Sequence, residues 1–463
     1  MTMKLKNMGL VALAGLMMTG CKSLYGTYER PEVNTQGLMR DVSEPVDSVN
    51  VNDSGFGNLP WRSVFTDAHL VEHIETALGN NVDLLNAALN VQMAEVQLKA
   101  ARLAFLPQFT FTPQGTIASW DGGKATQTYQ LPVNASWNVD LFGSLLSQKR
   151  GSQVALLATK DYQTVVKTNI IASVANMYYT LLMLDKQQEI LEDMSRLTKD
   201  TWETMKLQME FGRARATGVQ TAESNYYSVQ TRMVDMKRQI RETENALSLL
   251  LGQPAQSIAR GKLEEQHLPS SFSTGVGIAL LANRADVHAA EMKLAQCFYG
   301  VETARSRFYP NLNISASGIF TNSAGGAVVN PGKWLLSAVG SLVQPIFMKG
   351  QLVAGLKVAE AQYQQAYNTW QNAILKAGNE VSNALVLYNL SDEKSKLEDA
   401  QIAILEKNVD DTRMLFNSSG STYLEIITAQ QSLLNVKLSK ITDDFRKMQA
   451  VVNLYQALGG GAN

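Results

Sequence analysis

Apolar residues repeat with alternating three- and four-residue spacing in two long stretches of the chain. One stretch begins at Val219 and the other at Leu424, and each ends in a Leu-Gly pair. Such a seam is typical of paired helices in a coiled coil. The seam residues are Ala222, Tyr226, Val229, Met233, Met236, Ile240, Thr243, Leu247 and Leu250 in the first stretch, and Ile427, Gln431, Leu434, Leu438, Ile441, Phe445, Met448, Val452 and Tyr455 in the second.

A longer helical pattern precedes each seam. It extends from about Ser144 to Glu210 in the first case and from about Gln351 to Phe416 in the second. At about 1.5 Å per residue, each helix would reach about 100 Å if unbroken. Such a length is far beyond that of a helix in a globular domain. The first pattern has apolar residues at every seventh position: Ile170, Met177, Leu184 and Leu191.

The helical pattern gives way to alternation after Pro107 and again after Pro310. Apolar and polar residues then alternate as in a strand, and a Gly-containing loop ("DGGKA" or "NSAGGAVVNPGK") leads to a second strand. The chain therefore has four predicted strands of about ten residues, the length that crosses a bilayer when tilted. The alternative is a soluble antiparallel sheet with one wet face. Residues near strand ends suit an aromatic belt: Trp120, Trp137 and Trp334.

The chain is an internal duplication. Sliding the sequence along itself by about 205 residues superimposes both Pro-marked transitions and both seams, as expected for two copies of one unit. We predict a signal peptide (1–20), a lipidated tether (21–60), a first structural repeat (61–252), an inter-repeat linker (253–283) and a second repeat (284–460). Each repeat contains a helix, a β-hairpin and a long helix pair. Four strands cannot close a barrel, so a membrane-embedded sheet would require several chains to share one.

The N-terminus has the layout of a secretory signal. Two lysines precede an apolar run that ends at Met18, and Gly20-Cys21 follows. The Gly-Cys pair resembles a bacterial lipobox, in which the cysteine is lipidated; the alternative is an ordinary signal peptide with a chance cysteine. Lys22 in the next position resembles a signal for the outer membrane. Beyond the signal, no apolar run of about 18 residues predicts a transmembrane helix.

Composition and motifs give no case for an enzyme, a metal site or nucleic-acid binding. The net charge of −1 offers no electrostatic attraction for nucleic acid. His69, Glu72 and His73 lack an evident third ligand, so we expect an exposed helix there. The sequence has no Gly-x-Ser-x-Gly elbow, no Cys/His dyad context and no clustered carboxylate pair in a predicted pocket. We expect Cys297 to be a small buried apolar residue, and no cofactor beyond a covalent lipid on Cys21.

The run "LLANRADVHAAEMKLAQCFYGVETARSRFYPNLNISASGIF", from Leu280 to Phe320, resembles the signature of the TolC-like outer membrane factors. It is most similar to their lipoprotein branch. The motifs "VDLFG", "LLLGQP", "QPIF" and "YLEIITAQQSLL" match in family order, so the resemblance covers essentially the whole mature chain. Ala285 departs from the proline usual after the arginine.

The resemblance implies an α+β membrane protein that acts as a homotrimer. Twelve strands, four from each chain, would form one β-barrel in the outer membrane, continued by an α-helical coiled-coil barrel in the periplasm. The implied function is the passive exit duct of a tripartite efflux system. Its partners would be a periplasmic adaptor, an inner-membrane pump of the RND type and outer-membrane lipid. The alternatives are the exit duct of a type I protein secretion system and a lipid-anchored periplasmic scaffold.

The resemblance also places candidate site residues at the helix tips. The channel constriction falls on Leu424, Glu425, Thr428 and Gln431. Three Glu425 carboxylates around one axis would favour bound cations; the alternative is a solvated glutamate that favours the helix dipole. Many relatives have Asp where Thr428 stands. The adaptor contact would involve Arg213, Arg215, Thr217, Gly218, Val219 and Gln220 at the first tip, where the arginines are alternatively only solvated, and Ser421, Thr422 and Tyr423 at the second.

Overall fold

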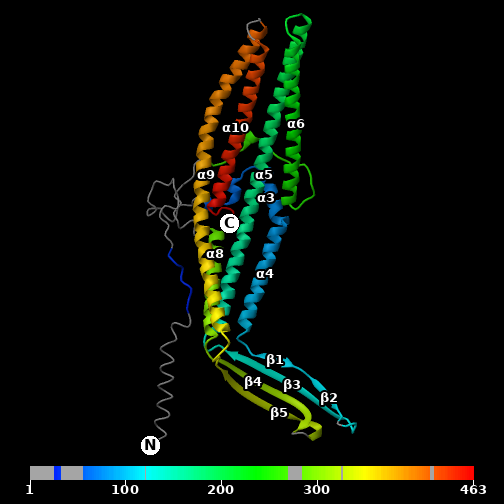
Figure 1. Cartoon of the computed structure of the whole chain (residues 1–463), viewed down its shortest axis with the longest axis vertical. Coiled ribbons are helices and arrows are strands. Elements are labelled where there is room, and N and C mark those ends of the chain that lie inside the picture. Colours follow the sequence, from blue (N-terminus) through cyan, green and yellow to red (C-terminus); the bar gives the residue numbers. More distant parts are fainter. Residues whose placement is uncertain are drawn as a thin grey trace. The chain divides into compact units, whose positions relative to one another are not determined.

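The computed structural model describes residues 26–32, 56–119, 121–269, 284–324, 327–417 and 422–462 (Figure 1). Its elements in chain order are η3 (Phe56–Asn58), α2 (Trp61–Val64), α3 (Ala68–Asn80), α4 (Val82–Leu103), β1 (Gln108–Phe111), β2 (Gln114–Ala118), β3 (Thr126–Val139), α5 (Ser144–Glu210), α6 (Ala216–Leu250), η4 (Leu263–Glu265), α8 (Ala285–Ser306), β4 (Asn311–Ala324), β5 (Ala327–Val343), α9 (Gln351–Asn417) and α10 (Tyr423–Ala457). The long helices predicted from the apolar spacing are confirmed, and α5 has the bounds expected from the sequence.

The chain divides into two compact units, each assembled from distant segments. The sheet unit comprises Met1–Val33, Leu89–Asp161 and His288–Asn372. The tip unit comprises Asn34–Ala88, Tyr162–Val287 and Ala373–Asn463. Within the described residues, no helix combines the length and the apolar content needed to cross a membrane.

Capping side chains and glycines set the helix ends. The Asp67 carboxylate accepts the backbone N–H groups at the start of α3, at 2.8 and 3.3 Å. The Asn81 side-chain oxygen likewise accepts the backbone N–H groups of Asp83 and Leu84 at the start of α4. This cap marks the break between α3 and α4. The Leu-Gly pairs at the ends of both seams stop α6 and α10, because Gly252 and Gly459 adopt left-handed φ angles of 69° and 83°.

The strands form one antiparallel sheet in the order β1-β3-β4-β5, with β2 also paired to β3. The strand predicted after Pro107 is split into β1 and β2, because Pro113 between them has no N–H to donate. The loop predicted as "NSAGGAVVNPGK" is mostly strand, since β4 continues to Ala324 and β5 begins at Ala327. Position 332 in β5 requires glycine, because a Cβ there would lie 2.7 Å from the Thr321 carbonyl oxygen. Trp120 lies outside the described residues.

The register gives the sheet one apolar face. The pairs Ala135–Ala316 and Gly318–Leu336 place these four residues on the same side. That side carries Phe109, Phe111, Leu131, Val133, Ala135, Trp137, Leu312, Ile314, Ala316, Gly318, Phe320, Trp334, Leu336, Ala338, Gly340 and Leu342. The opposite face is mostly polar and includes Thr110, Asn134, Ser136, Asn138, Asn313, Ser315, Ser317, Ser337 and Ser341. The predicted alternation is therefore confirmed.

Apolar clusters hold α5 and α6 together in the tip unit. One cluster contains Leu184, Leu191, Met194, Val229, Met236 and, from α10, Leu434. A second lies beneath the tips and contains Met205, Val219, Ala222 and Ile427. The predicted seam on α6 is thus buried or half-buried, and it meets α10 as well as α5. Gln431 does not belong to the seam: it is exposed, whereas Gln430 beside it is buried.

Charged and polar groups join α9 to α10 over much of their contact. The Ser439 hydroxyl donates to the Glu398 carboxylate at 2.6 Å, and Lys394 pairs with the buried carboxylate of Asp443. Lys437 pairs with Glu406 at 2.6 Å. Hydrogen bonds from Lys396 and Lys447 lower the pKa of Asp392 to about 2. The second helix pair therefore combines these ion pairs with an apolar cluster of Val409, Ala429 and Leu433.

Arg284 fastens the end of α10 inside the tip unit. Its buried guanidinium donates to the Ala457 carbonyl oxygen at 2.9 Å and pairs with Asp286 at 2.8 Å and Glu380 at 2.7 Å. Although burial opposes the charge, the two carboxylates raise the pKa of Arg284. One side chain therefore links the start of α8, the middle of α9 and the last turn of α10.

Candidate functional site

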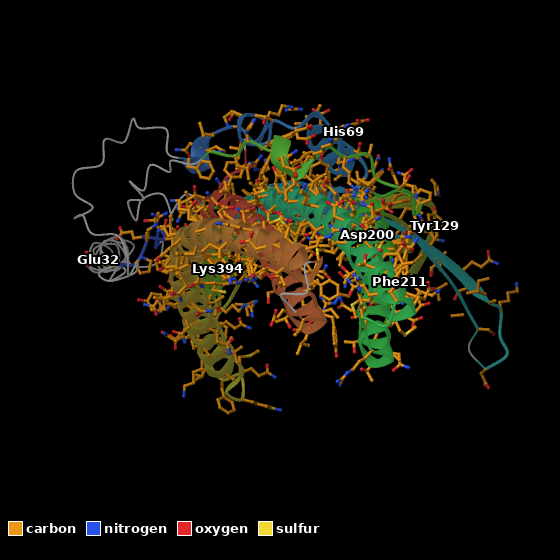
Figure 2. The ribbon with its side chains drawn as sticks, turned by 90° about the horizontal axis from the view of Figure 1, so that it is seen from above. Glu32, His69, Tyr129, Asp200, Phe211 and Lys394 are labelled. Atoms are coloured by element: carbon orange, nitrogen blue, oxygen red, sulfur yellow. The ribbon has the colours of Figure 1, made fainter. Side chains whose placement is uncertain are left out.

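The turn from α5 to α6 forms the first tip. Gly212 takes a left-handed φ of 69°, and the Arg213 N–H donates to the Gln208 carbonyl oxygen at 2.8 Å, which closes the end of α5. Arg213 and Arg215 are exposed, as is Phe211 at the tip, labelled in Figure 2. The predicted tip arginines therefore lie on an open surface.

The next four predicted tip residues divide into two pairs. Thr217 and Gln220 are exposed, whereas Gly218 and Val219 are buried. A Cβ on Gly218 would lie 2.8 Å from Met205 Cε and 3.2 Å from the Tyr423 ring. Gly218 therefore provides the room in which Tyr423, from the second tip, packs onto the first. Sequence alone did not indicate this support role, because the contact joins residues about two hundred positions apart.

Glu425 closes a capping box at the start of α10. Its Oε2 accepts the Thr422 N–H at 3.2 Å, and the Thr422 side chain accepts the backbone N–H of Glu425. A carboxylate at this position stabilises a helix start through both hydrogen bonding and the macrodipole. The structure thus gives Glu425 a local role that matches the alternative reading of its sequence position. Ser421 lies outside the described residues.

The predicted constriction residues share an exposed strip on α10. Leu424, Glu425, Thr428 and Gln431 are all exposed, and Leu424 retains 60% of its accessible surface. The spacing of Leu424, Thr428 and Gln431 places them on one helical face. The residues between them point inward and are buried: Ile426, Ile427, Ala429 and Gln430.

Two amides near the strip were not predicted as site residues. The Gln431 side chain donates to Asn225 Oδ1 on α6 at 3.0 Å, so the strip is tied to the other helix pair. Buried Gln430 donates to Thr201 Oγ1 on α5 at 2.9 Å. The polar pair Gln430-Gln431, which interrupts the apolar seam, was the available signal for Gln430. Together these bonds fix how the first turns of α10 sit against α5 and α6.

The paired histidines of α3 and the thiol of Cys297 have the following surroundings. The His73 ring donates to the Ala259 carbonyl oxygen at 2.8 Å. Among the described residues, no three His, Cys, Asp or Glu side chains are grouped as metal ligands would be. Cys297 is half-buried rather than fully buried, and desolvation raises the pKa of its thiol.

Comparison with known proteins places these features in a family. The model of the family described as "Outer membrane efflux protein" matches residues 73–253 and 278–460. The chain is 27% identical over 457 residues to the cation efflux system protein CusC of Escherichia coli K12, covering 96% of this chain and 97% of CusC. It is 26% identical over 468 residues to the toluene efflux pump outer membrane protein TtgC of Pseudomonas putida, covering 97% and 95%.

Solved structures agree with the fold. The crystal structure of CusC superimposes with a TM-score of 0.84 at 24% identity, covering 94% of this chain and 99% of that one. The outer membrane protein VceC of Vibrio cholerae superimposes with a TM-score of 0.80 at 22% identity, covering 87% and 98%. The resemblance to outer membrane factors is confirmed by the matched segments, which cover both copies of the duplication. The chain therefore belongs to the outer membrane efflux protein family.

Proposed function

We propose that three copies of this chain form a passive exit duct. A sheet from each copy lines one barrel in the outer membrane, and the paired helices continue it as a tunnel. In this proposal residues 61–252 and 284–460 act as equivalent halves of each copy, joined by the linker 253–283. Substrate enters at the helix tips and leaves outside the cell.

The two-faced sheet carries this proposal. Its apolar face fits lipid, and its mostly polar face fits a water-filled interior. The sheet has open edges at β5 and at β1 with β2. Unpaired backbone groups are costly in lipid, so edges of neighbouring copies would pair and remove them.

The tips are the proposed entrance. Exposed Leu424, Glu425 and Thr428 would line the constriction, with Gln431 behind them. The exposed tip residues Arg213, Arg215, Thr217 and Gln220 would contact a periplasmic adaptor, whereas buried Gly218 and Val219 support that surface from beneath. Thr422 and Tyr423 at the second tip, with Ser421, would complete the contact.

The proposed partners are an adaptor and an energy-supplying pump of the RND type. Named relatives serve a cation efflux system and a toluene efflux pump. Such different cargoes on a shared architecture support a duct whose wall leaves substrate selection to its partners. We infer no cofactor for the duct itself, apart from a lipid on Cys21.

A lipid on Cys21 would anchor the chain beside the sheet. Cys21 lies outside the described residues, but 26–32 run along α8: Arg30 pairs with Glu291 at 2.6 Å and the Tyr28 ring packs on Phe298. As the residue number falls, this segment approaches the end of α8, and Gly26 faces Glu302. Five extended residues add at most about 17 Å, which keeps the lipid near the start of β4. The relative SilC is named a probable outer membrane lipoprotein.

The proposal is tested by the mass and conductance of the purified protein. Extracted from outer membranes in mild detergent, it should have three times the mass of one mature chain and should form pores in planar bilayers. A monomeric particle without conductance would contradict the duct.

Glu425→Gln should weaken the block of that conductance by multivalent cations. Three carboxylates would be removed from one ring, while the amide can still accept the Thr422 N–H and keep the capping box. We expect the blocking concentration of a trivalent cation to rise at least about tenfold. Glu223→Gln, which removes a half-buried carboxylate from α6, is the control. An unchanged block in the Glu425 variant would remove Glu425 from the constriction.

A further inference from the structure

We propose that the sheet holds an anionic phospholipid at its helix end. One acyl chain occupies a groove on the apolar face, and the headgroup phosphate meets cations at the helix-to-strand junctions. The inference rests on the proposed function, because the sheet must lie in the bilayer. Groove and cations both belong to the sheet unit.

The groove is formed where small residues interrupt the large ones. Its floor is Ala135 on β3, Ala316 and Gly318 on β4, and Ala338 on β5. Its volume is about 480 Å³, within the usual range of ligand pockets. Three large side chains stand around the floor: Phe109, Trp334 and Leu336. The side chains that line the groove are apolar. Ser317 and Ser337 also border it, but their hydroxyls, which hydrogen-bond each other at 2.7 Å, lie on the opposite face of the sheet.

The position of the groove along the strands places it in the membrane leaflet nearer the helices. Ala316 is five residues beyond Asn311, where β4 begins. At about 3.3 Å per residue and a tilt of about 40°, the floor lies about 13 Å into the membrane. One leaflet of the hydrocarbon core is about 15 Å thick. A chain from a headgroup at the helix end would therefore pass along the floor.

Cations without carboxylate partners surround that end of the sheet. Arg102 is in the last turn of α4, Arg307 follows α8, and Lys349 precedes α9. All three are exposed, and none has an acidic partner within the described residues, unlike nearby Arg305, which pairs with Glu302 at 2.9 Å. Basic residues beside a membrane surface attract anionic headgroups. The cations lie within six residues of a strand end, at headgroup level.

Aromatic side chains mark the same level. The Trp137 ring N–H donates to the Phe105 carbonyl oxygen at 2.9 Å, and Phe142 stacks on Tyr309 with ring centroids 5.1 Å apart. Such rings concentrate where hydrocarbon meets headgroups. A second copy is the less suitable occupant, because copies would pair through the sheet edges and leave the floor on β3 and β4 uncovered.

The test measures which lipid contacts the embedded protein. The trimer is reconstituted into phosphatidylcholine vesicles with a trace of spin-labelled phosphatidylglycerol or phosphatidylcholine, and the motionally restricted fraction is recorded. The natural sequence should prefer phosphatidylglycerol. The double variant Arg307→Gln, Lys349→Gln should lower that preference by about fivefold per cation, and Ala316→Leu should lower it by filling the groove. The matched controls are Arg213→Gln with Arg215→Gln at the tip, and Gly340→Leu on the same face outside the groove.

The outcomes separate the site from the duct. Loss of the preference in both test variants, with both controls unchanged, supports the lipid site. A preference that falls with the cations but not with Ala316→Leu would overturn the groove and leave only a general surface attraction. An unchanged preference in both test variants would overturn the proposal. So would occupation of the groove by the chain's own acyl group, in which case the natural sequence would show no preference between the two lipids and the Cys21→Ala variant would gain one. Protein released by carbonate washing would contradict the duct itself.

Discussion

Replacing Leu336 by arginine should prevent the protein from assembling in the membrane. Leu336 is 78% exposed in the middle of β5, on the apolar face of the sheet. An arginine near the bilayer midplane costs about 2–4 kcal/mol in each copy, and every copy of the assembly would carry it. We expect the carbonate-resistant trimer in outer membranes to fall at least tenfold, measured by unheated gel electrophoresis and immunoblotting.

Ser337→Arg is the matched control for this experiment. Ser337 is the next residue on the same strand, and its side chain belongs to the mostly polar face. Because that face would meet water, the control should assemble close to normally. Equal loss in the two variants would mean that the faces are not divided between lipid and water, and the proposed orientation of the sheet would be wrong.

Replacing Arg284 by methionine should destabilise the tip unit. The change removes hydrogen bonds to the Ala457 carbonyl oxygen and to the carboxylates of Asp286 and Glu380. Both carboxylates keep more than a third of their accessible surface, so water can replace part of the lost interaction. We therefore expect a loss of about 2–3 kcal/mol, somewhat below the usual cost of breaking a fully buried pair. Denaturant titration of the detergent-solubilised protein, followed by circular dichroism, measures it.

Two further variants separate charge from geometry at this position. Arg284→Lys keeps the charge but has no planar fork for bonding three partners, so it should recover only part of the stability. Lys376→Met removes an exposed partner of Glu380 at 3.9 Å and should cost less than about 1 kcal/mol. If the Arg284→Met variant kept the free energy of unfolding of the natural sequence, the guanidinium would be dispensable for holding the end of α10.

The helices could be predicted from the sequence because their information is local. A repeated apolar spacing and a terminal glycine define α6 and α10 without any knowledge of neighbours, and Gly252 and Gly459 do stop these helices. The seam assignment was wrong at Gln431, where Gln430 is the buried amide. A strict spacing rule shifts by one residue near a helix start, since the partners there come from three helices rather than one.

The strand ends and the tip support depend on distant partners. Pro331 and Gly332 indicate a turn locally, yet both lie within β5, in the irregular stretch between the pairs Thr321–Lys333 and Ser323–Val328 that join β5 to β4. Likewise, Gly218 reads as part of an exposed turn, but the Tyr423 ring from the other repeat covers it. The constriction and adaptor residues stay predictions. Exposure of the four constriction residues and of Arg213, Arg215, Thr217 and Gln220 fits those roles, whereas Gly218 and Val219 are buried. The roles themselves depend on copies and partners outside this chain.

The two repeats contain helix pairs of identical size. α5 and α9 each have 67 residues, and α6 and α10 each have 35. In a ring of such hairpins, the tips reach a common plane only while these lengths stay equal. Deleting one heptad from α5 alone would set its tip back by about 10 Å. Evolutionary insertions and deletions in the two halves should therefore occur together, at corresponding positions, even though the side chains of the halves have diverged.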